Sequence, residues 1–415
     1  MQIAIVGAGI VGAATAYELA ADGHEVTVFE QRGAAAEEAS FASAGLLAPA
    51  LLTPWAQPAI GAGLRRQLWG SDATLRLVRG AGSAGLRWLW RWRQAGRSPA
   101  ALAQLAALAG LGRYSLARTR ELTELLQVDI ETSNGALVLL RRPDCLERVQ
   151  PTVTLLREAG MSLSEVDADT ARLIEPGLSA DTPLAGALYA PDGEAGNCRL
   201  FALVLRQAAQ DLGAQFMFGS KVRALGQAAA GLRIAGEDAP RRFDAVVLCA
   251  GLASAGLLRP LGLRLPLAAL YGYTISAPLR EDTHAPQGAV IDPLHRLIIT
   301  RQGQRVRVSG GAEIGHGGGV QHQATLQTLY LALSGWFPGG AFASSPQVQV
   351  WRGARPMLPD GAPVIGASGL PGLWLNTGHG ACGWAQACGS ARALADVMAA
   401  RAPAIDLQAF SAQRL

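Results

Sequence analysis

The sequence predicts an α/β fold: a domain with a parallel sheet, and a discontinuous second domain of α+β type built on a mixed β-sheet. Three observations support this. The first thirty residues alternate strand, helix and strand. Buried strands recur at 244–251 and 373–377, and residues 289–311 have the pattern of an antiparallel hairpin.

Composition limits the class of protein. The 415 residues suffice for two or three domains or one large mixed unit, and the 50% hydrophobic content excludes a mainly disordered chain. The net charge of +4 is too small to indicate nucleic acid by itself. The five cysteines form no CxxC pair, so we expect neither a disulfide framework nor a metal site. Residues 42–64 carry no charge, but three prolines exclude a membrane-spanning helix there.

The first strand and helix predict a Rossmann-type dinucleotide site. The apolar residues 2–6 run into GAGIVG, in which Gly7 permits a tight turn, Gly9 lets a pyrophosphate approach, and Gly12 lets the helix pack closely. The helix N-terminus stabilises phosphate charge. Glu30 ends the second strand, where a carboxylate can accept hydrogen bonds from a ribose. This motif does not separate NAD from FAD.

Segments farther along separate the two cofactors. Small residues follow the second strand, with the sequence SFASAGL at 40–46. This segment resembles the D-amino acid oxidase superfamily of FAD enzymes, in which such a segment runs beside the isoalloxazine ring. Residues 220–225, SKVRAL, and 244–251, DAVVLCAG, resemble strands that approach the cofactor in two-dinucleotide-fold flavoproteins. The resemblance implies FAD.

The C-terminal region carries the most specific match. Residues 351–361 read WRGARPMLPDG, and residues 373–384 read LWLNTGHGACGW. Both resemble bacterial D-amino acid dehydrogenases of the small-subunit type, as does LTPWAQP at 52–58. The resemblance is weakest over residues 60–190. It implies the following cofactor-binding residues: Gly7, Gly9, Ile10, Val11, Gly12, Glu30, Gln31, Arg32, Ser43, Ala44, Gly45, Leu46, Val222, Cys249, Ala250, Gly251, Gly353, Arg355, Gly378, His379, Gly380, Gly383 and Trp384.

Five residues are candidates for catalysis. Arg355 stands where the superfamily has its carboxylate-binding arginine, and a guanidinium grips a carboxylate with two hydrogen bonds. His379, in the glycine-rich turn before the last helix, contacts the flavin or the substrate, or serves only the turn. His295 lines the pocket or lies in a surface turn; relatives commonly carry a tyrosine near this position. Tyr271 and Tyr273 line the site or serve packing.

The resemblance implies oxidative deamination of D-amino acids to 2-oxo acids and ammonia. A hydride passes from Cα to flavin N5, and the electrons go on to a quinone or another respiratory acceptor. Two alternatives stay open. One is oxidation of a secondary or small amine, such as D-proline, D-hydroxyproline, glycine or sarcosine. The other is a flavoprotein module that binds RNA or a membrane partner.

A basic, tryptophan-rich segment bears on whether the protein binds a membrane. Residues 61–120 contain eleven arginines, one acid and four of the nine tryptophans. This composition suits a bilayer interface, and equally a helical hairpin whose tryptophans pack on the substrate-domain sheet. Nucleic acid is not expected, because no nucleic-acid fold signature accompanies the charge. The protein is expected in the cytoplasm, either free or peripheral on the inner face of the cell membrane.

The motifs also suggest domain boundaries. The FAD-binding domain is expected from residues 1–55, 195–255 and 345–415, and the substrate domain from residues 56–194 and 256–344.

Overall fold

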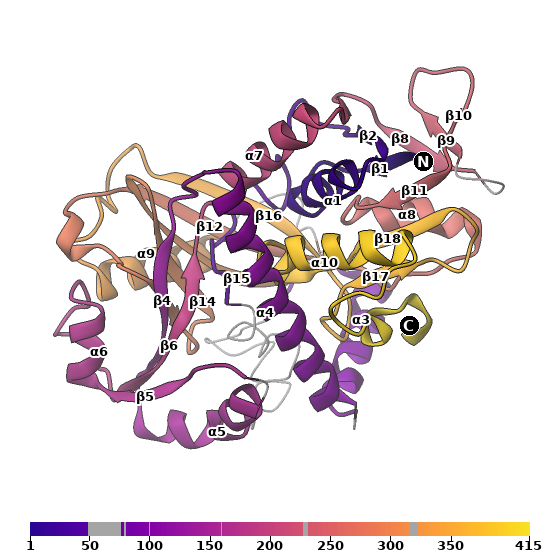
Figure 1. The fold of residues 1–415 in the computed structure, drawn as a ribbon. Coiled ribbons are helices and arrows are strands. Elements are labelled where there is room, and N and C mark those ends of the chain that lie inside the picture. The colour runs from indigo at the N-terminus through magenta and orange to yellow at the C-terminus, as the bar shows by residue number, and fades with distance from the viewer. Residues whose placement is uncertain (49–75, 79, 99, 159, 227–230, 316–321) are drawn as a thin grey trace.

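The computed structural model describes residues 1–48, 76–78, 80–98, 100–158, 160–226, 231–315 and 322–415. Most of the strands in these residues form a six-stranded and a nine-stranded sheet (Figure 1). The predicted mixed α/β fold is confirmed. The segment at 52–58 and Trp69 lie outside the described residues.

The six-stranded sheet has the order β17-β18-β11-β1-β2-β7, and every neighbouring pair is parallel except β17 with β18. Its central strands are almost wholly apolar, as expected where both faces of a sheet are covered. Its strands are β1 (Gln2–Val6), β2 (Glu25–Phe29), β7 (Gln215–Met217), β11 (Ala245–Leu248), β17 (Val364–Ala367) and β18 (Leu373–Thr377).

Four helices form a layer beside this sheet. Helix α1 (Ile10–Ala21) packs against α7 (Cys198–Asp211) and α10 (Gly383–Met398), and α10 packs against α4 (Ala101–Leu125) (Figure 1). A buried carboxylate joins three of them. Glu18 of α1 has no exposed surface, and it lies 2.8 Å from Arg118 Nε of α4 and 2.9 Å from Arg392 Nη1 of α10. Helix α10 is therefore held by charge as well as by apolar packing.

The nine-stranded sheet is mixed and has the order β16-β12-β15-β14-β13-β4-β6-β5, with β3 paired to β15. Helix α9 (Gln323–Trp336) packs on β12 and β15. The strands are β3 (Arg76–Leu77), β4 (Ser133–Leu140), β5 (Ser164–Asp167), β6 (Gly186–Ala195), β12 (Ala268–Pro278), β13 (Ala289–Asp292), β14 (Leu297–Gln302), β15 (Arg305–Ile314) and β16 (Gln349–Met357).

The expected hairpin over 289–311 is present and has one more turn than expected: β13, β14 and β15 are successively antiparallel. Strand β16 pairs with β12 along nine positions. Residues 349–357 therefore extend the nine-stranded sheet past the domain boundary expected at residue 345.

Smaller elements complete the described part of the chain. A three-stranded sheet has the order β10-β9-β8. The remaining strands and helices are β8 (Val222–Leu225), β9 (Gly231–Ile234), β10 (Arg241–Arg242), α3 (Gly82–Ala95), α5 (Pro143–Glu158), α6 (Ala168–Ile174) and α8 (Ala253–Leu258), with short 3-10 helices at Arg259–Leu261, Asp282–His284, Gly380–Cys382, Gln408–Phe410 and Ala412–Arg414.

Candidate active site

The glycine turn between β1 and α1 is shaped for close approach. Gly7 has φ +103°, and a Cβ atom there would lie 2.6 Å from the carbonyl oxygen of Cys249. A Cβ atom on Gly12 would lie 1.9 Å from the carbonyl oxygen of Gly7. Only glycine fits these two positions, because any side chain would separate α1 from β1 and β11.

The carboxylate of Glu30 is placed to bind a ribose. Glu30 is 9% exposed, and its carboxylate accepts hydrogen bonds from the backbone N–H groups of Ala8 and Arg32, both at 2.8 Å. These bonds fix the carboxylate at the end of β2, and each oxygen keeps further lone pairs for a ligand hydroxyl. The carboxylate lines the same cavity as Gly9.

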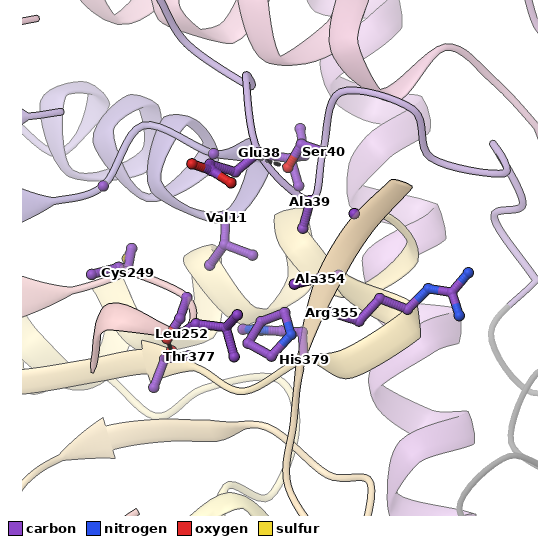
Figure 2. A pocket seen from close by; sticks show the side chains of 18 of the residues that line it. Val11, Glu38, Ala39, Ser40, Cys249, Leu252, Ala354, Arg355, Thr377 and His379 are labelled. Carbon is purple, nitrogen blue, oxygen red and sulfur yellow. Dashed lines mark hydrogen bonds between the residues drawn. The ribbon is translucent and has the colours of Figure 1, made fainter. Parts of the chain in front are cut away.

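A cavity of about 480 Å³ is lined by residues from both large sheets. That volume lies in the range of small-molecule and cofactor sites. Figure 2 shows Val11, Cys249, Leu252 and His379 around it. The predicted cofactor residues that line it are Gly7, Gly9, Ile10, Val11, Glu30, Gln31, Ser43, Ala44, Leu46, Val222, Cys249, Ala250, Gly251, Gly353, Arg355, Gly378, His379, Gly380, Gly383 and Trp384.

Three predicted cofactor residues do not line the cavity. Gly12 is turned to the helix–strand contact. Arg32 points to the surface, where it forms an ion pair with Glu38. Gly45 has φ +85° and lies against Gln302, whose amide nitrogen would be 2.4 Å from a Cβ atom there.

Arg355 brings a partly buried charge to the cavity. It lies in β16 opposite Leu270 of β12, its guanidinium packs over Gly272, and Nη1 donates to the carbonyl oxygen of Gly311 at 3.0 Å. Burial lowers the pKa of the guanidinium to about 10. The group is still positively charged at neutral pH, so it can bind a carboxylate. Figure 2 shows its side chain extending away from the His379 ring.

His379 contributes a neutral imidazole. It is 4% exposed, and burial lowers its pKa to about 3. Its Nε2 lies 3.2 Å from Ser390 Oγ of α10, and its backbone pairs with Met357 of β16. The ring therefore stays uncharged and fixed at physiological pH, beside the N-terminus of α10.

Comparison with known proteins places this site in a family. The model of the FAD dependent oxidoreductase family matches residues 2–397. The chain belongs to the FAD-dependent oxidoreductase family. A D-amino acid dehydrogenase of Cereibacter sphaeroides is 38% identical over 414 residues, covering 98% of this chain and 93% of the relative. A D-amino acid dehydrogenase of Rhizorhabdus wittichii is 36% identical over 411 residues, covering 98% of both.

Solved structures show the same fold. Glycine oxidase from Geobacillus kaustophilus superimposes with a TM-score of 0.77 at 22% identity, covering 100% of this chain and 99% of its own. L-proline dehydrogenase from P. horikoshii superimposes with a TM-score of 0.74 at 15% identity, covering 100% and 97%.

The resident cofactor is FAD. The residues present fit it: the glycine cradle would be filled by any Cβ atom, Glu30 is fixed for a ribose, and the N-terminus of α1 offers the N–H groups that bind phosphate.

Three catalytic candidates lie elsewhere. In β12, Leu270 and Gly272 pair with Arg355 and Gly353 of β16. Tyr271 and Tyr273 alternate with them along β12, so they belong to the opposite face. Tyr273 is fully buried and donates to Glu313 at 2.9 Å, and Arg352 stacks over the Tyr271 ring at 3.8 Å. His295 lies in the turn between β13 and β14, outside the cavity.

Other lining residues were not predicted. Thr274 and Ser309 face the cavity from β12 and β15, and Trp351 faces it from β16. Ser40 Oγ accepts from the N–H of Ile10 at 3.1 Å, at the start of α1. Alternation along 268–278 is the signal that could have paired Thr274 with Gly272 on one face.

The tryptophans of α3 divide between two environments. Trp88 and Trp92 are buried against the nine-stranded sheet, and Trp88 Nε1 donates to the carbonyl oxygen of Met357 at 3.2 Å. Trp90 is 61% exposed. The packing expected for a helical hairpin therefore accounts for Trp88 and Trp92, but not for Trp90.

Proposed function

We propose that the protein catalyses the oxidative deamination of D-amino acids to 2-oxo acids and ammonia, and passes the electrons to a quinone or another respiratory acceptor. The observation that carries the proposal is the charged Arg355 beside the FAD cavity, in a chain whose relatives named D-amino acid dehydrogenase match it over nearly its full length.

Arg355 binds the substrate carboxylate and thereby fixes the substrate's orientation. A partly desolvated guanidinium is a strong binding site for an anion. A bound carboxylate supplies the hydrogen bonds that the group has lost to water. FAD, when bound, supplies the acceptor for the hydride that leaves the substrate Cα.

The surrounding groups favour the reactive form of the substrate. Apolar side chains such as Val11, Leu252 and Ile298 line the cavity and exclude water. Low polarity disfavours the charged ammonium, so it favours loss of a proton from the substrate amine. His379 adds no positive charge, and the N-terminus of α10 favours negative charge at the cavity wall.

Product analysis tests the reaction. Purified holoenzyme, supplied with a D-amino acid and a soluble quinone analogue, should form 2-oxo acid and ammonia in equal amounts. Enzyme reduced anaerobically and then mixed with either oxygen or the quinone analogue identifies the acceptor. We expect reoxidation by the quinone analogue to be at least about tenfold faster. Faster reoxidation by oxygen would instead identify an oxidase.

The outward face of α3 is the proposed membrane contact. Leu86 is 57% and Trp90 61% exposed, with the exposed Arg87 and Arg91 beside them. An apolar ring with arginines on either side suits an anionic lipid interface. None of the helices in the described residues is long and apolar enough to cross a bilayer.

Co-sedimentation with vesicles tests this contact. The holoenzyme should bind vesicles that contain anionic lipid, and the double variant Leu86→Ser, Trp90→Ser should lose most of that binding while keeping its flavin. Equal binding by the variant and the wild type would exclude α3 as the contact.

A further inference from the structure

The segment from Ala42 to Gly45, which borders the cavity, is held by its carbonyl groups. Each of its four consecutive carbonyl oxygens accepts a hydrogen bond from a side chain far away in the sequence. The four bonds are Thr274 Oγ1 to Ala42 at 2.9 Å, Arg307 Nη1 to Ser43 at 3.0 Å, Thr300 Oγ1 to Ala44 at 2.8 Å, and Trp384 Nε1 to Gly45 at 2.9 Å.

Three of the four donors lie on one face of the nine-stranded sheet, in two neighbouring cross-strand rows. Thr274 lies in β12, and Thr300 in β14 pairs directly with Arg307 in β15. Ser309 stands opposite Thr274, with its Oγ 2.8 Å from Thr274 Oγ1. When Thr274 donates its proton to Ala42, Ser309 donates to Thr274, so this pair forms a directed chain. All four of these side chains point to the face of the sheet that meets the cavity.

The donors from the nine-stranded sheet are shielded from water or charged. Thr300 is fully buried and Thr274 is 4% exposed, so neither hydroxyl has water as an alternative partner. Burial lowers the pKa of Arg307 to about 10, which leaves its guanidinium charged at neutral pH. A charged donor gives a stronger hydrogen bond than a hydroxyl. Arg307 binds the carbonyl group of Ser43, the middle one of the three that accept from the sheet.

The hydrogen bonds to the carbonyl groups of residues 42–45 also fix the direction of the peptide N–H groups. In a trans peptide the C=O and the following N–H point in opposite directions. Since the carbonyls of Ala42 and Ser43 point to the sheet side chains, the N–H groups of Ser43 and Ala44 point away from them. Within the described part of the chain neither N–H has a hydrogen-bond acceptor, and both residues line the cavity.

We infer that Thr274, Thr300 and Arg307 are positioning residues for the flavin: they hold the peptide planes of residues 42–45 so that the N–H groups of Ser43 and Ala44 are presented to it. Side chains of the nine-stranded sheet thereby determine the backbone geometry of the cofactor site beside the six-stranded sheet. The inference rests on FAD binding and is independent of which amine the enzyme oxidises.

The test removes one hydroxyl at a time with little change in shape. Thr300→Val and Thr274→Val each delete a donor, and Thr300→Ser keeps it. The matched control is Thr119→Val, because Thr119 is 1% exposed, donates to the carbonyl oxygen of Ser115 at 2.8 Å, and does not line the cavity. For each protein we would measure the Kd of the apoprotein for FAD, the visible absorption band of the bound flavin, and the thermal unfolding temperature.

Each of the two cavity variants should bind FAD about fivefold to tenfold more weakly, the value of one buried hydrogen bond. Each should also shift the flavin band, and Thr300→Ser should restore both properties. The control should lower the unfolding temperature and leave the Kd and the band unchanged. The inference would be overturned if both valine variants bound FAD within twofold of the wild type with an unshifted band, or if the serine variant behaved like valine. Should Thr300→Val not fold, Thr274→Val decides alone.

Discussion

Two arginines three residues apart in β16 should have opposite roles, and exchanging each for methionine separates them. Arg355 faces the cavity, whereas Arg352 faces the other side of the sheet, where it lies 3.6 Å from Glu313. Methionine keeps the apolar part of either side chain and removes its charge. The two variants therefore differ in which negative group loses its positively charged partner: the substrate carboxylate or Glu313.

The magnitudes follow from burial. Loss of the Arg355 charge leaves a substrate carboxylate desolvated and unpaired, which costs about 3–5 kcal/mol of transition-state stabilisation. This corresponds to a decrease in kcat/KM of about 150- to 5,000-fold. Glu313 is 2% exposed, so Arg352→Met should cost about 3 kcal/mol of unfolding free energy while kcat/KM stays within about threefold.

Steady-state kinetics and denaturant unfolding of both holoenzymes measure the two quantities. The reasoning would be refuted if Arg352→Met lost as much kcat/KM as Arg355→Met, or if Arg355→Met turned over substrate normally.

Three further predictions concern stability and cofactor binding. His379 has a pKa of about 3 in the fold against about 6.5 when unfolded, so below pH 6.5 the unfolded chain binds more protons; going from pH 8 to pH 5 should cost about 2 kcal/mol through this group, and His379→Gln should remove that part of the pH dependence in denaturant unfolding. Glu18→Ala leaves Arg118 and Arg392 without their buried partner, and should lower the unfolding free energy by about 3 kcal/mol without changing the Kd for FAD; a change below about 1 kcal/mol would contradict the assigned charge cluster. Gly7→Ala should yield folded but colourless protein, as measured by flavin absorbance and circular dichroism, because its Cβ atom would meet the carbonyl oxygen of Cys249; a yellow variant would contradict the tight turn.

The parts of the site that the sequence predicted are those set by local geometry. A tight glycine turn between a strand and a helix has the same spacing wherever it occurs, so Gly7, Gly9 and Glu30 could be placed from the first thirty residues. The glycine-rich turn around His379 was assigned to the cofactor site by its resemblance to D-amino acid dehydrogenases, and it also lines the cavity.

The remaining parts depend on which strands pair. Alternation along 268–278 defines two faces but does not say which one meets the cavity. The sequence therefore left Tyr271 and Tyr273 open between lining the site and packing, and the structure places Gly272 and Thr274 at the cavity instead. The hydrogen bond of Thr300 to Ala44 spans 256 positions of sequence, and no local sequence pattern predicts it.

The central claim, that this FAD enzyme oxidises D-amino acids, is tested most directly by its reductive half-reaction. Holoenzyme is mixed anaerobically with matched enantiomers of several amino acids, and with glycine, sarcosine and D-proline, while the visible flavin absorbance is followed. The account predicts that D-enantiomers bleach the flavin at least about 100-fold faster than their L-counterparts. Preference for L-enantiomers, or no bleaching by any amino acid in protein that holds FAD, would contradict it. Fastest bleaching by glycine, sarcosine or D-proline would move the substrate class to small or secondary amines.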